Sequence, residues 1–91
     1  MRKGNVASAS NGYKIIVVDD EMGIIDSLSI FLKRSGYEFT GVTDPLEAIE
    51  RVKNEHFDLM LLDFIMTPIH GDQVVEEIRK FNKELYILLL T

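Results

Sequence analysis

Two short apolar runs that end in carboxylates constrain the fold of this chain more than any other feature. The run at residues 15–18 is followed by Asp19 and Asp20, and the run at residues 59–62 is followed by Asp63. Short, continuous aliphatic runs are typical of strands buried on both faces of a parallel sheet. If both strands point the same way, their carboxylates lie at one edge of the sheet, and we expect that edge to attract a divalent cation.

Size and composition exclude several classes of protein. A chain of 91 residues allows one domain at most, and its apolar fraction of 46% with 27% charged residues is that of a globular protein. A net charge of -5 argues against a surface for nucleic acid, and the lack of cysteine excludes disulfides and zinc-thiolate sites. No apolar stretch is long enough for a membrane span or a signal peptide, so we expect a cytoplasmic location without membrane contact.

Strand and helix patterns alternate along the chain. After a flexible N-terminal tail at residues 1–12, the pattern predicts strands at 13–19, 37–42, 59–63 and 86–90, with a helix in each interval and the third helix over about residues 71–82. The residues predicted to face the core are Ile24, Ile25, Leu28, Phe31 and Leu32 in the first helix, Leu46, Ile49 and Val52 in the second, and Val74, Val75, Ile78 and Phe81 in the third.

This alternation predicts the α/β class, with a parallel sheet and right-handed crossovers. Sheets of this kind bind ligands outside the carboxyl ends of their strands, where the winding reverses. If the first and third strands are neighbours at that point, Asp19, Asp20, Asp63 and Thr91 converge on one pocket. Carboxylates about 4 Å apart repel one another by about 1 to 4 kcal/mol, and bound Mg²⁺ would reverse that sign.

Three segments of the sequence carry a family resemblance. Residues 16–21 (IVVDDE), 58–63 (DLMLLD) and 88–91 (LLLT) together resemble the receiver domain of two-component response regulators, of the chemotaxis-regulator type. The resemblance covers the chain from about Tyr13 to Thr91. It implies a flavodoxin-like sheet in the strand order 2-1-3-4-5 and a role in signal transduction.

The resemblance also implies a role for each matching residue. Asp63 would be the phospho-acceptor for a histidine kinase or a phosphotransfer protein, and the Thr91 hydroxyl would contact the phosphoryl group. Mg²⁺ would be held by Asp19, Asp20 and Asp63 with the backbone carbonyl of Ile65. A domain of this kind is a phosphoprotein that controls a downstream output, and it is no enzyme beyond its own phosphorylation and dephosphorylation.

The sequence departs from the family pattern in two places. Receiver domains usually place proline four residues after the acceptor, where this chain has Thr67 and then Pro68. A full receiver domain also continues through a fourth helix, a fifth strand with a lysine that pairs with the phosphoryl group, and a fifth helix. We therefore expect residues 13–91 to form a partial receiver domain, with strands in the order 2-1-3-4 and an open edge at residues 86–90. Unless a further segment covers that edge, we expect the chain to pair with another copy, swap elements or aggregate.

Other interpretations remain beside the phospho-acceptor. The chain could be a phosphorylation-independent interaction or dimerisation module that keeps the receiver fold, and a hydrolytic metalloenzyme using the acidic pocket is a more distant alternative. His70 could tune the pH response of the pocket or be a solvated loop residue. Gly23, Asp26 and Ser27 on the first helix could meet a kinase.

Overall fold

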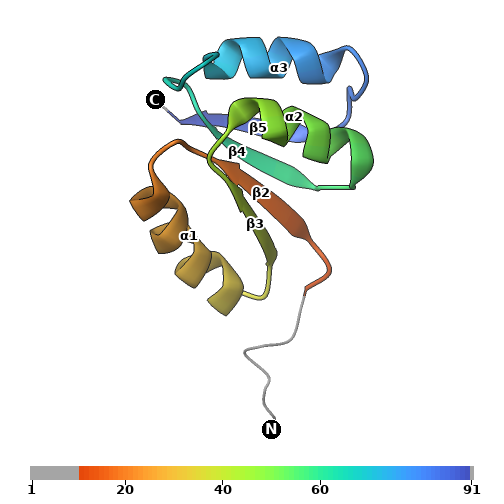
Figure 1. Cartoon of the computed structure of the whole chain (residues 1–91). Helices are drawn as coiled ribbons and strands as arrows, with labels where there is room; N and C mark the ends of the chain where they lie inside the picture. The colour runs from red at the N-terminus through yellow and green to blue at the C-terminus, as the bar shows by residue number, and fades with distance from the viewer. Residues whose placement is uncertain (1–10, 91) are drawn as a thin grey trace, which may run out of the picture.

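The computed structural model describes residues 11–90, in which strands and helices alternate along the chain (Figure 1). The elements are, in order, β2 (Lys14–Val18), α1 (Met22–Arg34), β3 (Glu38–Val42), α2 (Pro45–Asn54), β4 (Leu59–Asp63), α3 (Gly71–Arg79) and β5 (Tyr86–Leu90). The predicted alternation is therefore confirmed, and α3 ends three residues before the predicted Asn82. Thr91 and residues 1–10 of the predicted tail lie outside the described residues.

The four strands form one parallel sheet in the order β3-β2-β4-β5. Numbered by their sequence order, this is the predicted order 2-1-3-4 of a flavodoxin-like α/β fold. The central strand is β2, which pairs with β3 on one side and β4 on the other, and four of its five residues are buried. The direction of winding reverses between β2 and β4, so their carboxyl ends form the edge at which such sheets bind ligands.

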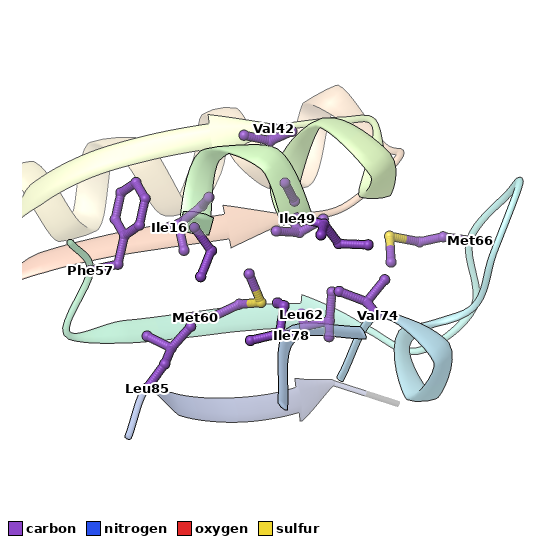
Figure 2. Close-up of a cluster of buried hydrophobic side chains, with 13 residues drawn as sticks. Ile16, Val42, Ile49, Phe57, Met60, Leu62, Met66, Val74, Ile78 and Leu85 are labelled. Carbon is purple, nitrogen blue, oxygen red and sulfur yellow. The ribbon is translucent and has the colours of Figure 1, made fainter. Parts of the chain in front are cut away.

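Helices cover both faces of the sheet, with α1 on one face and α2 and α3 side by side on the other (Figure 1). Successive residues of a strand point to opposite faces, so Ile15 and Val17 of β2 pack under α1, while Ile16 and Val18 join the core beneath the other two helices. Figure 2 shows this second and larger core. Each large aliphatic side chain buried there contributes about 1.5 to 3 kcal/mol.

Turn and cap residues fix where the helices begin and end. The carboxylate of Asp44 accepts a hydrogen bond from the Leu46 N–H at 2.9 Å, and Pro45 is the first residue of α2. The first helix ends at Arg34 with Ser35 as its C-cap, and Gly36 follows with a φ of 92°, a conformation that favours glycine.

Four residues predicted to face the core are exposed instead: Ile24, Phe31, Leu46 and Phe81. Phe31 keeps 65% of its surface exposed, because α1 meets the sheet along the narrower stripe of Ile25, Leu28 and Leu32. The predicted apolar stripes were wider than the faces that the sheet covers. These predictions were wrong because periodicity locates the apolar side of a helix but not the width of its contact.

The β5 strand forms an edge of the sheet with large apolar side chains in contact with solvent. Tyr86 is 77% exposed and Leu88 is 55% exposed, and β5 pairs with β4 alone in the part of the chain that is described. The open edge predicted at residues 86–90 is therefore present within the described chain.

Across residues 11–90, no helix combines the length and the apolar character needed to span a membrane.

The carboxylate of Asp58 ties the start of β2 to the segment before β4. Its Oδ2 accepts a hydrogen bond from the Lys14 N–H at 2.8 Å, and its Oδ1 lies 3.0 Å from Nε2 of His56. The backbone hydrogen bond from Lys14, with the His56 contact second, lowers the pKa of Asp58 from its ordinary value of 3.8. The ionised carboxylate therefore stabilises the fold above pH 3.8, and that stabilisation is lost as the pH falls through the lowered pKa.

We expect Asp58→Asn to lower the free energy of unfolding at neutral pH, because the amide accepts the Lys14 hydrogen bond without the help of a charge. The difference from the unchanged chain should shrink as the pH falls below 3.8. Urea unfolding at a series of pH values measures this. Asp26→Asn, an exposed change on α1, is the control. If the Asp58→Asn chain had a free energy of unfolding lower by the same amount at every pH, the assigned role of the Asp58 charge would be wrong.

Candidate functional site

The carboxyl ends of β2 and β4 bring three acidic residues together. Asp19 directly follows β2, and Asp63 is the last residue of β4. The register pairs Val18 with Leu62, so the positions of Asp19 and Asp63 are adjacent across the two strands. Carboxylate oxygens of Asp19, Asp20 and Asp63 all lie within 4.8 Å of one another, and within residues 11–90 this is the one group of its kind. The sequence predicted these three residues as one cluster, and the structure brings them together.

The three carboxylates differ in their exposure to solvent. Asp19 is 7% exposed, Asp63 is half-buried and Asp20 is exposed. Asp19 keeps one compensating contact, because its Oδ1 accepts a hydrogen bond from the Glu21 N–H at 2.8 Å. Asp63 is held more loosely, with the Ile65 N–H at 3.4 Å from its Oδ1. The half-buried carboxylate of Asp63 is thus accessible to a reactant, whereas Asp19 is buried and hydrogen-bonded to the Glu21 N–H.

Burial raises the pKa of Asp19 above its ordinary value of 3.8, the Glu21 hydrogen bond opposes this, and the charges of Asp63 and Asp20 raise the pKa further. The folded chain therefore binds the Asp19 proton more tightly than the unfolded chain does. This contribution stabilises the fold fully below pH 3.8 and is lost as the pH rises through the raised pKa. At neutral pH the cost of ionising Asp19 therefore destabilises the fold, and a bound cation would offset that cost.

Two further residues, Ile65 and Thr91, were predicted to contact the metal or the phosphoryl group, and the described structure includes only Ile65. Ile65 lies in the loop directly after β4 with an exposed side chain, and the prediction that its carbonyl binds metal stays a prediction. Thr91 lies outside the described residues, so its predicted contact with a phosphoryl group also stays a prediction. The Thr67–Pro68 peptide bond in the same loop is cis.

The first residue of α3, Gly71, packs closely against the backbone at the end of β4. The Gly71 N–H donates to the Phe64 carbonyl at 2.7 Å, and a Cβ added at Gly71 would lie 2.6 Å from the backbone oxygen of Asp63. The same Cβ would lie 2.9 Å from Cδ2 of Leu89 and 3.0 Å from Cα of Phe64. Because only glycine fits here, Gly71 sets how closely α3 approaches the end of β4.

His70 closes the loop that follows Asp63. Its Nδ1 accepts a hydrogen bond from the Met66 N–H at 3.3 Å, and its ring stacks on Phe64 at 6.3 Å between centroids. The His70 N–H in turn donates to Oε1 of Gln73 at 2.9 Å, which caps the first turn of α3. His70 is exposed, which agrees with the interpretation as a solvated loop residue, and its contacts also organise the loop. Nothing in the local sequence pattern marked this stacked pair.

The donor set fits a hard divalent cation. Three carboxylates supply oxygen ligands only, and one of them is buried with its pKa raised partly by the charges of the other two. Mg²⁺ is bound in proteins by one or two carboxylates together with water and substrate oxygens, which suits a cluster with one buried and two more accessible members. The cluster can therefore hold such an ion while leaving an Asp63 oxygen available for chemistry.

We expect Asp20→Asn to stabilise the metal-free fold by about 1 kcal/mol at neutral pH, because it removes a charge that repels Asp19 and Asp63. Urea unfolding without divalent cations measures the change, and addition of Mg²⁺ should stabilise the unchanged chain more than the variant. Glu84→Gln, an exposed charge removal before β5, is the control and should change little. A less stable Asp20→Asn chain without metal would show that the cluster is not held under repulsion.

Comparison with known proteins identifies relatives over nearly the whole chain. The family model of the response regulator receiver domain matches residues 15–91. The alkaline phosphatase synthesis transcriptional regulatory protein PhoP of Bacillus subtilis is 37% identical over 78 residues, which are 86% of this chain and 32% of that protein. The chain thus spans about a third of the length of this curated relative.

Solved structures agree with the sequence comparison. The response regulator protein TrrA of Thermotoga maritima, solved in complex with Mg²⁺–BeF, superposes with a TM-score of 0.82 at 39% identity, covering 87% of this chain and 69% of that one. The complex of the histidine kinase ThkA with TrrA matches with a TM-score of 0.81 at 39% identity over 87% of this chain and 68% of that one.

Proposed function

The chain belongs to the response regulator receiver domain family, and from this membership we propose that Asp63 accepts a phosphoryl group from a histidine kinase or a phosphotransfer protein in a Mg²⁺-dependent reaction. The observation that carries the proposal is the meeting of Asp63 with Asp19 and Asp20 at the carboxyl ends of β2 and β4. A half-buried carboxylate beside two potential metal ligands is the arrangement that phosphoryl transfer to an aspartate requires.

Asp63 is the nucleophile in this proposal. One of its carboxylate oxygens forms a bond to phosphorus while the phosphorus–nitrogen bond of the donor phosphohistidine breaks, and the departing imidazole keeps the electron pair and takes up a proton. The transferred group carries its charge on three equatorial oxygens, and catalysis consists mostly of alignment and neutralisation of that charge. The Ile65 N–H near Asp63 and the loop held by His70 would help to orient the Asp63 carboxylate for attack.

Asp19, Asp20 and Asp63 would hold Mg²⁺, with the Ile65 carbonyl as a further ligand. When bound, the ion supplies positive charge that neutralises the carboxylates and the phosphoryl oxygens. The Thr91 hydroxyl would donate to a phosphoryl oxygen. TrrA, which is 39% identical to this chain, was solved in complex with Mg²⁺–BeF, and this supports the assignment of the metal.

The partner and the setting follow from the same family. The complex of ThkA with TrrA supports a sensor histidine kinase as the phosphoryl donor, and Gly23, Asp26 and Ser27 on the exposed side of α1 are candidates for its contact. Phosphorylation would shift a conformational equilibrium that a downstream output reads. The domain would act in the cytoplasm as an acceptor and catalyse no reaction on other molecules.

Beryllofluoride titration tests the proposal without a kinase, because beryllofluoride mimics a phosphoryl group on a carboxylate. In nuclear magnetic resonance spectra we expect shifts of the amides of residues 19–21 and 63–66 that need both Mg²⁺ and beryllofluoride. The same titration of Asp63→Asn should show no beryllofluoride response. Identical responses of the two chains, or a response without Mg²⁺, would remove the phospho-acceptor assignment.

A second candidate function is self-association through β5, with no need for phosphorylation. The observation that favours it is the exposure of Tyr86, Leu88 and Leu89 on an edge strand, since an apolar edge with free backbone groups pairs readily with another strand. A dimer formed by two β5 edges would extend the sheet across both copies.

We expect sedimentation of the 91-residue chain to show a fraction of dimer that increases with protein concentration. Leu88→Lys should shift the equilibrium towards monomer, because a charged edge resists pairing. Ile30→Lys, an equally exposed apolar site on α1, is the control and should leave the dimer unchanged. A monomer at every concentration would rule out this second function.

A further inference from the structure

The packed pair α2 and α3 leaves a groove whose lining residues are all different from those of the acidic cluster. The groove has a volume of about 470 Å³. From α2 it is lined by Leu46, Ile49 and Glu50, from α3 by Gln73, Glu76 and Glu77, and from the preceding loop by Ile69. Figure 1 shows the two helices side by side over the same face of the sheet.

The two walls of the groove differ in chemistry. Each helix contributes residues spaced by three and four, so each wall is one helical face. The α2 wall is mainly apolar, and its Leu46 is 49% exposed although it lies at a position predicted for the core. The α3 wall carries Glu76 and Glu77. Glu50 completes an acidic rim around the apolar floor.

Among residues 11–90, no lysine or arginine lines the groove. Glu50 has Lys53 at 3.5 Å and Glu77 has Lys80 at 2.7 Å, but both lysines lie outside the lining, and Glu76 has no ion-pair partner within residues 11–90. Exposed ion pairs of this kind contribute little, so an incoming cation can replace either lysine at small cost. The rim therefore favours positively charged ligands and disfavours phosphate-bearing ones such as nucleic acid and anionic lipid.

We propose that the groove between α2 and α3 binds a segment of a partner protein that presents an apolar side chain flanked by lysine or arginine. The apolar side chain occupies the floor against Leu46, Ile49 and Ile69, and the flanking cations pair with Glu50, Glu76 and Glu77. This recognition mode is the docking of an amphipathic helix into a hydrophobic groove. The surface shares no residue with the three carboxylates of the acidic cluster, and its Ile69 belongs to the loop that follows Asp63.

The probes for this surface are three matched, fluorescein-labelled short helical peptides. The first is built of lysine and leucine with the leucines on one face, the second replaces its lysines with glutamate, and the third replaces its leucines with serine. We expect the full chain to bind the lysine–leucine peptide at least about tenfold more tightly than either of the others by fluorescence anisotropy. Added salt should weaken that binding.

Variants locate the binding. Glu76→Lys and Leu46→Ala should each weaken binding of the lysine–leucine peptide by about tenfold or more. The controls Glu84→Lys and Ile30→Ala should leave its affinity unchanged. In the unchanged chain the amide shifts should fall on residues 45–54 and 69–77. Shifts centred on residues 19–21 and 63–65, equal affinity of the groove variants and their controls, or no binding of the lysine–leucine peptide would each overturn the proposal.

Discussion

Asp63→Asn is expected to abolish phosphoryl acceptance by this chain. Incubation with acetyl phosphate and Mg²⁺ should add one phosphoryl group to the unchanged protein and none to the variant, as measured by mass spectrometry of the intact chain. The reason is chemical, because an asparagine amide has nearly the same shape as the carboxylate but lacks the nucleophilic oxygen anion. A fold that is intact by circular dichroism would show that only the chemistry is lost.

The neighbours of Asp63 provide the matched comparison. Asp19→Asn and Asp20→Asn keep the nucleophile and remove a proposed metal ligand, so they should raise the Mg²⁺ concentration needed for phosphorylation by about tenfold, equivalent to about 1.4 kcal/mol of binding. Glu84→Gln, an exposed position just before β5, should leave the Mg²⁺ dependence unchanged. If Asp63→Asn still gained a phosphoryl group, another residue would be the acceptor and the proposed function would fail.

Gly71→Ala is expected to destabilise the fold by about 2 to 3 kcal/mol, because the new methyl group meets backbone atoms that cannot rotate away. The added Cβ would lie 2.6 Å from the Asp63 oxygen and 3.0 Å from Cα of Phe64. Either α3 moves away or the end of β4 shifts, and Asp63 moves with it. We therefore expect weaker beryllofluoride binding together with a lower free energy of unfolding, measured by urea denaturation.

Gly23→Ala is the control for that experiment. Gly23 lies in the first turn of α1, as Gly71 lies in the first turn of α3, but a Cβ at Gly23 would meet nothing within 4 Å. Alanine is the better helix former by up to about 1 kcal/mol, so Gly23→Ala should stabilise the fold slightly or leave it unchanged. Equal free energies of unfolding for Gly71→Ala and Gly23→Ala would show that α3 can move away from β4 without destabilising the fold.

Much of the candidate site could be predicted from the sequence because its signal is local. The aliphatic runs before Asp19 and Asp63 predict strands, and parallel strands in an alternating chain place their carboxyl ends at one edge. The sequence did not predict the His70–Phe64 stack or the burial of Asp19. Both depend on how the loop after β4 folds back, which no local periodicity describes.

The sequence by itself determined the order of strands and helices, the family, and the three carboxylates at the ends of β2 and β4. The order of strands and helices follows from hydrophobic patterning within short segments, and the family follows from the resemblance of residues 16–21, 58–63 and 88–91 to receiver domains. Only the tertiary structure decided that Leu46 and Phe31 stay exposed, that Gly71 touches Asp63, and that α2 and α3 enclose an acid-rimmed groove. Local sequence fixes which face of an element is apolar, whereas covering that face depends on which distant element packs against it and how closely.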